Sequence, residues 1–145
     1  MTEQFAYPVA VERDEAGFYL VTFSDFPETA TDGRSEAEAL HEAADALEEA
    51  IAGRINRGDD IPHPSRPIPG QSIVPVPAQI AVKAALYLAV KETGIRNTEL
   101  ARRLGADEKE VRRLLDPHHK SKLPRIEAAL EALGKNLVIG IEARA

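Results

Sequence analysis

Positively charged side chains concentrate in the last third of the chain, where their types and spacing suit the binding of nucleic acid. Arginine can donate two parallel hydrogen bonds to guanine, and arginine and lysine both neutralise phosphate groups. The residues that we expect to contact DNA include Arg102, Arg103, Glu108, Lys109, Arg112, Arg113, Lys120 and Lys122. We expect Arg112 or Arg113 to contact a base. Phosphate contacts, which add affinity without sequence choice, are expected from Arg102, Arg103, Lys120, Lys122 and Arg125.

Two short helices, predicted over residues 97–104 and 107–115, would position these side chains. Ala101 is small enough for the helices to pack closely, Gly105 suits a turn with positive φ, and Val111 would face the first helix. This spacing resembles the helix-turn-helix of phage-repressor-like proteins, in which the second helix enters the major groove of DNA. The alternative is a small helical bundle with a solvated basic face.

Carboxylates and histidines form no comparable pattern. The acidic residues of the N-terminal third that could bind Mg²⁺ are Glu12, Asp14, Asp25, Glu28 and Asp32. Asp14 and Asp32 fall in predicted turns, where aspartate is favoured for local hydrogen bonds. His118 and His119 are adjacent and would point in different directions, and the chain has no cysteine. We therefore expect no metal site, no cofactor and no enzymatic activity.

The N-terminal half is predicted to form a sheet and one helix. Strands are expected over residues 5–11 and 18–23, with a short third strand near 29–31, because apolar, β-branched and aromatic residues dominate there. Ser35 and Glu38 have the spacing of a capping box, which predicts the start of a helix. Leu40, Leu47 and Ile51 lie on its apolar stripe, and Gly53 is the expected end, with helical character possible to residue 56.

The rest of the chain is predicted to be helical, with one strand at each end. Residues 62–77 hold six of the ten prolines and indicate a stiff connector, in which Ile73 and Val74 could add a fourth strand. Further helices are expected over residues 78–92 and 123–133, and a terminal strand over 136–141. These elements predict an α+β protein with domains at residues 1–75 and 76–145.

The charge of the chain is divided between the two halves. Residues 1–75 have 5 Lys/Arg and 15 Asp/Glu, a net of −10, whereas residues 76–145 have 13 and 9, a net of +4. This division favours two partners of opposite charge. The chain has no apolar run long enough to span a membrane and no feature of a signal peptide, so we expect a cytoplasmic protein.

Residues 7–51 resemble the HicB antitoxin family. The shared features are a Tyr-Pro-Val start, an acidic turn with glycine, an Asp-x-Pro-Glu loop, a Thr-x-Gly turn and a Glu-Ala-Leu helix. They are found at residues 7–9, 14–17, 25–28, 31–33 and 38–40. Ser24 departs from a proline that is common in the family. The resemblance implies a partial RNase H-like fold without a nuclease site, and a longer family form with a C-terminal helix-turn-helix.

The resemblance also implies partners. They are a HicA toxin, which is a small basic ribonuclease that cleaves mRNA, and the operator DNA of the shared operon. Two surfaces are candidates for the toxin: the loop of Asp25, Phe26, Pro27 and Glu28, or the helix face with Glu42, Glu48 and Glu49. Phe26 could equally belong to the core.

We expect a homodimer or a higher homo-oligomer, because one helix-turn-helix contacts few bases. The alternatives are a stand-alone regulator with a ligand-sensing N-terminal domain and, less favoured, an RNase H-like nuclease.

Overall fold

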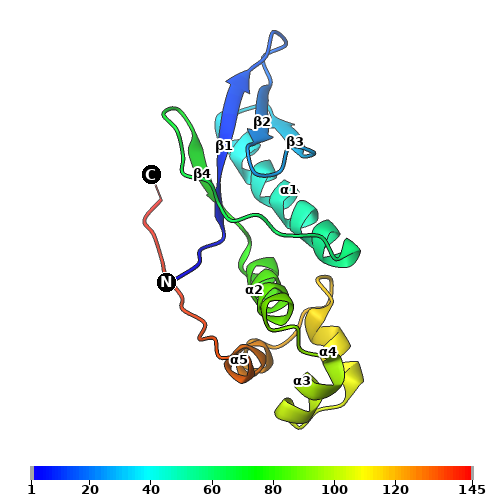
Figure 1. Cartoon of the computed structure of the whole chain (residues 1–145). Coiled ribbons are helices and arrows are strands. Elements are labelled where there is room, and N and C mark those ends of the chain that lie inside the picture. The colour runs from blue at the N-terminus through cyan, green and yellow to red at the C-terminus, as the bar shows by residue number, and fades with distance from the viewer. Residues whose placement is uncertain (1, 145) are drawn as a thin grey trace.

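The computed structural model describes residues 2–144 and has an α+β fold. Its strands are β1 (Ala6–Arg13), β2 (Tyr19–Phe23), β3 (Ala30–Gly33) and β4 (Ser72–Pro75). Its helices are α1 (Glu36–Arg57), α2 (Ala78–Thr93), α3 (Asn97–Leu104), α4 (Glu108–Leu115) and α5 (Leu123–Ala132). Figure 1 shows α2 leading from the sheet and α1 to the group formed by α3, α4 and α5. The predicted α+β class and the presence of all five helices are confirmed, but the expected end of the first helix at Gly53 is wrong, since α1 continues to Arg57 and Gly58 caps it in a left-handed conformation.

The four strands form one antiparallel sheet in the order β3-β2-β1-β4. Val9 is paired with Phe23, and Tyr7 with Val74, so these four apolar side chains lie on one face of the sheet. All four are buried. The opposite face has the partly exposed side chains of Leu20 and Ile73.

Helix α1 covers the buried face of the sheet with the apolar stripe that the sequence predicted. Ser35 Oγ accepts a hydrogen bond from the Glu38 amide at 3.1 Å, as expected for the cap. The Glu38 carboxylate accepts from the amide of Arg34 rather than from that of Ser35. Gly33 at the end of β3 lets the first turn of α1 pack closely against the strand, since a Cβ at this position would lie 2.4 Å from the Ala39 nitrogen.

The proline-rich segment is attached to the N-terminal half at two points before it enters β4. Tyr7 donates a hydrogen bond to the carbonyl of Pro62 at 2.7 Å, and the Ser65 amide donates to Asp25 at 3.0 Å. The segment then enters β4, which pairs with β1. The prolines therefore stiffen a chain that belongs to the N-terminal core, instead of holding two bodies apart as a free spacer would.

Helix α2 contributes to both hydrophobic cores. Ile80 and Ala84 pack with the sheet and α1, whereas Leu86 and Ala89 pack with α3, α4 and α5. Packing in the N-terminal half thus continues past residue 76, where we expect the domain boundary.

The predicted terminal strand at residues 136–141 is wrong for the single chain. Residues 135–144 have no regular secondary structure and extend away from α5. Val138, Ile139 and Ile141 are exposed, the last at 96%. The composition favours a strand, but a strand needs hydrogen bonds from a neighbour, and residues 2–144 offer none to this segment.

Candidate functional site

Helices α3 and α4 pack as a pair joined by a short turn. Ala101 and Val111 are buried between them. Gly105 ends α3 with φ of +61°, a left-handed conformation that favours glycine, and its amide donates to carbonyls of α3. Asp107 then caps α4, because its Oδ1 accepts from the Glu110 amide at 2.8 Å. The predicted spacing of alanine, glycine and valine is therefore confirmed as the packing of two short helices.

The outer face of α4 is polar and exposed. Glu108, Lys109, Arg112 and Arg113 all lie on the surface. Arg112 is 3.7 Å from the Glu108 carboxylate, a loose pair that an exposed arginine can leave at little cost. This face can therefore present donors to a ligand.

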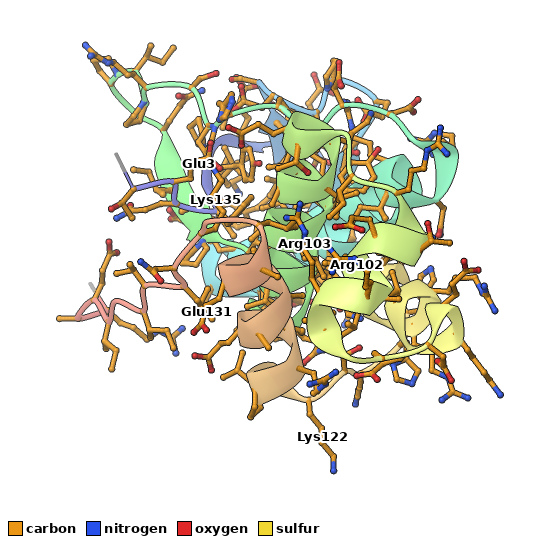
Figure 2. All side chains as sticks on the ribbon, turned by 60° about the horizontal axis from the view of Figure 1, so that its bottom comes forward. Glu3, Arg102, Arg103, Lys122, Glu131 and Lys135 are labelled. Atoms are coloured by element: carbon orange, nitrogen blue, oxygen red, sulfur yellow. The ribbon has the colours of Figure 1, made fainter. Side chains whose placement is uncertain are left out.

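A hollow of about 220 Å³ lies beside the end of α4. Its lining residues come from α4, the following loop and the start of α5: Glu110, Arg113, Leu114, His119, Lys120, Ser121, Lys122 and Arg125. Arg125 is paired with Glu110 at 2.6 Å. Among residues 2–144, the other cations here, Arg113, Lys120 and Lys122, form no ion pair. Figure 2 shows Lys122 extending outward from the start of α5.

Arg102 and Arg103 have intramolecular partners. Both donate to Glu99, and these hydrogen bonds lower the pKa of the Glu99 carboxyl to about 2. Arg103 also donates to the Ala132 carbonyl at the end of α5, at 3.0 Å. In Figure 2 the two arginines lie on a different part of the surface from Lys122. They are thus separate from the hollow, and Arg103 helps to attach α3 to α5.

The loop of residues 25–28 differs from an exposed binding loop. Phe26 is 0% exposed and packs edge-on against Tyr7, with ring centroids 5.0 Å apart. The interpretation of Phe26 as an exposed anchor is therefore wrong, because its ring completes the core. Pro27 remains exposed, while Asp25 binds Ser65 and Glu28 forms an ion pair with Arg54 at 2.7 Å.

The second candidate surface for the toxin is the face of α1 with Glu42, Glu48 and Glu49. Glu42 and Glu48 are half-buried and Glu49 is exposed. Within the part of the chain that the structure describes, none of the three forms an ion pair. They leave uncompensated negative charge on the helix that covers the sheet.

The candidate metal ligands of the N-terminal third do not gather. Asp14 accepts from the Phe18 amide at 2.9 Å in a turn, and Asp25 and Glu28 have the partners named above. Residues 2–144 contain no group of three or more histidine or acidic side chains arranged to hold a metal ion. The two adjacent histidines have different neighbours. His118 Nε2 lies 3.2 Å from Asn56 Nδ2 of α1, whereas His119 Nδ1 lies 3.2 Å from Ser121 Oγ.

Sequence reasoning missed two features. One is Lys83, a buried lysine in the otherwise apolar centre of α2, where a single charge in an apolar run was the available indication. The other is the contact between α1 and the C-terminal half. Tyr87 and Lys91 of α2 donate to the carbonyls of Asp59 and Gly58, each at 2.7 Å. No local sequence pattern predicts these long-range contacts.

A family model and several named relatives match this chain, and all of them are described as HicB or HicB-like antitoxins. The sequence model of a family described as "HicB_like antitoxin of bacterial toxin-antitoxin system" matches residues 6–85. Antitoxin HicB 2 of Photorhabdus laumondii subsp. laumondii is 41% identical over 94% of this chain and 96% of its own length. Antitoxin HicB of Escherichia coli K12 is 37% identical over 90% of this chain and 95% of its own length, and that of Pseudomonas fluorescens is 33% identical over 96% of this chain and 95% of its own length.

No helix within residues 2–144 is both long and apolar enough to cross a membrane.

Proposed function

The chain belongs to the HicB-like antitoxin family, a family of antitoxins and not of enzymes, and from that premise we propose a function in two parts. In the first, the N-terminal half neutralises a HicA-type toxin that cleaves mRNA. In the second, the C-terminal half represses the shared operon by binding operator DNA. The two parts use oppositely charged halves of the chain, net −10 and net +4.

The DNA-binding part is carried by one observation: exposed cations without ion pairs border both α4 and the hollow beside it. In this proposal α3 and α4 act as a helix-turn-helix, and α4 enters the major groove. Arg112 or Arg113 then contacts a base, while Lys120 and Lys122 contact phosphates. Arg103 is less suited to a phosphate, because Glu99 and the Ala132 carbonyl already hold it.

The toxin-binding part is best supported at α1. A ribonuclease must hold polyanionic RNA, so its surface is basic, and opposed charges speed association with an acidic partner. Within residues 2–144, Glu42, Glu48 and Glu49 form no ion pair, whereas Asp25 and Glu28 have partners inside the N-terminal half. Under this proposal the sheet and α1 form a partial RNase H-like fold without a nuclease site.

A homodimer completes the proposal. Paired recognition helices about one DNA turn apart contact two half-sites, which one copy of α4 cannot. The exposed apolar side chains of Val138, Ile139 and Ile141 support pairing of two C-terminal segments across a two-fold axis.

The DNA-binding part is tested with the full chain and the DNA upstream of its own gene. Wild-type protein should retard this fragment in an electrophoretic assay more strongly than a random duplex. A variant with Arg112→Ala, Arg113→Ala and Lys122→Ala should not. Arg66→Ala, an exposed arginine of the N-terminal half, is the matched control and should bind as wild type does. Equal binding by all three proteins would refute the assignment of this surface.

The toxin-binding part is tested by co-expression with the product of the adjacent reading frame. Wild-type chain should restore growth and co-purify with that product. The triple variant should do both equally well, since it retains the acidic half. Continued growth arrest with wild-type chain would refute the neutralising role.

A further inference from the structure

Lys83 is a buried ammonium with three intramolecular acceptors. Its side chain is 2% exposed, in the middle of α2. Its Nζ donates to the carbonyl of Arg113 at 2.9 Å, to the carbonyl of Leu114 at 2.8 Å and to Ser121 Oγ at 2.7 Å. A lysine ammonium has three N–H donors, so the group is fully satisfied.

The acceptors lie at two places that this one side chain joins. The Arg113 and Leu114 carbonyls belong to the last turn of α4, where helical carbonyls lack partners within the helix and a cation is favoured by the helix dipole. Ser121 belongs to the loop that follows. Burial lowers the pKa of Lys83 to about 8, while the nearby Asp116 opposes that shift.

A stability role alone does not explain this choice of residue. Burying an ammonium requires loss of its hydration, and an apolar side chain of similar length would fill the same space at lower cost. What the ammonium adds is directional: it holds the end of α4 and the loop in one geometry. Arg113, Leu114 and Ser121, its three acceptors, all line the basic hollow.

We propose that Lys83 is a positioning residue for DNA binding, which fixes the two walls of the basic hollow relative to each other. With the walls fixed, Lys120 and Lys122 meet backbone phosphates while the outer face of α4 lies in the groove. This inference rests on the DNA-binding function proposed above. Lys83 itself lies beneath the surface and does not touch DNA.

The test replaces Lys83 by methionine in the full chain and measures binding to a short random duplex at several salt concentrations. Lys83→Met should lower the affinity about tenfold and reduce the salt slope by about one to two units, since Lys120 and Lys122 lose their phosphates. Lys91→Met, on the same helix but away from the hollow, is the control and should leave both unchanged. An unchanged affinity and slope for folded Lys83→Met would overturn the proposal.

Two further measurements guard against misfolding of that variant. Ser121→Ala removes the loop acceptor of Lys83, together with the contacts of the same hydroxyl to His119 and to the Arg113 carbonyl. The variant should stay folded by circular dichroism, accelerate amide exchange over residues 116–122 and weaken DNA binding several-fold. Wild-type protein should also show a slowly exchanging Nζ signal of Lys83 in ¹⁵N NMR. Absence of that signal, or wild-type exchange and affinity in Ser121→Ala, would overturn the proposal. A wild-type chain that binds no DNA would instead refute the proposed function itself.

Discussion

Burial decides what the two lysines of α2 do. Lys91 is partly exposed, and its hydrogen bond to the Gly58 carbonyl links the end of α1 to α2. Lys83 lies two turns earlier and is almost fully buried, so its donors are satisfied by the protein instead of by bulk water. The same residue type therefore joins two helices at the surface in one case and holds the end of a helix from beneath in the other.

The buried ammonium makes the stability of the chain depend on pH. Lys83 has a folded pKa of about 8 against 10.5 when unfolded, so between these values the unfolded chain binds the extra proton. Stability should therefore rise with pH across this window, by on the order of 3 kcal/mol. Urea denaturation at pH 7.5 to 10 should show this rise for wild type and a flatter profile for Lys83→Met. Parallel profiles would contradict it.

Single arginines of α4 should separate specificity from affinity. Arg112→Ala or Arg113→Ala should weaken binding to the upstream DNA by about 1–3 kcal/mol and relax sequence preference, if that arginine contacts a base. Lys122→Ala should weaken binding to all sequences alike and lower the salt slope by about one unit. Fluorescence anisotropy on upstream and random duplexes measures both. Equal losses on both DNAs for the two arginines would show that α4 does not contact bases.

At the level of elements, α1 has two faces with different tasks. Its apolar stripe closes the core over the sheet, and its acidic residues remain without ion pairs among residues 2–144. Replacing Glu42, Glu48 and Glu49 together by glutamine should slow association with the toxin, most of all at low salt, because steering depends on charge. Glu131→Gln on α5 is the charge control. Stopped-flow association rates that are the same in both variants would argue against α1 as the toxin surface.

The C-terminal segment is an element only if it finds a partner. Residues 136–141 favour a strand by composition but are unpaired in the described chain, where Leu137 is half-buried against the helical core and the other five residues are exposed. Deleting residues 136–145 should convert dimers to monomers in sedimentation experiments, because the proposed intermolecular strand pair is lost. A truncated chain that stays dimeric would show that another surface holds the dimer.

At the scale of the whole molecule, α2 ties the two halves together. Val74 of β4 and Ile80 and Ala84 of α2 complete the N-terminal core, while the other side of α2 completes the helical core. A fragment ending at Gln71 lacks all three of these residues and β4. We expect it to show no cooperative thermal unfolding, because the exposed core cannot close. Circular dichroism would test this, and a sharp transition would contradict it. Neutralisation is therefore best assigned with full-length variants.

Most helices and strands could be predicted from local sequence patterns. The capping box at Ser35, the glycine turn at Gly105 and the apolar stripe of α1 depend on neighbours within a few residues, and the structure has them where expected. The candidate DNA-contacting cations were also predictable as exposed residues, since charged side chains on helices avoid apolar neighbours.

Only the tertiary structure decided which side chains are buried and which bind partners within the chain. Phe26 follows a strand in a polar loop, yet it is buried because Tyr7, nineteen residues earlier in the chain, lies beneath it. Arg103 and Lys83 meet carbonyls about thirty positions away, and those partners turn two ordinary cations into internal supports. Residues 136–141 likewise form no strand in the single chain, because no distant segment of the described chain lies beside them to pair with. The sequence by itself determined periodicity, charge and family, which are local or cumulative properties. Burial and hydrogen-bond partners depend on which distant segments meet, so they were determined by the folded chain.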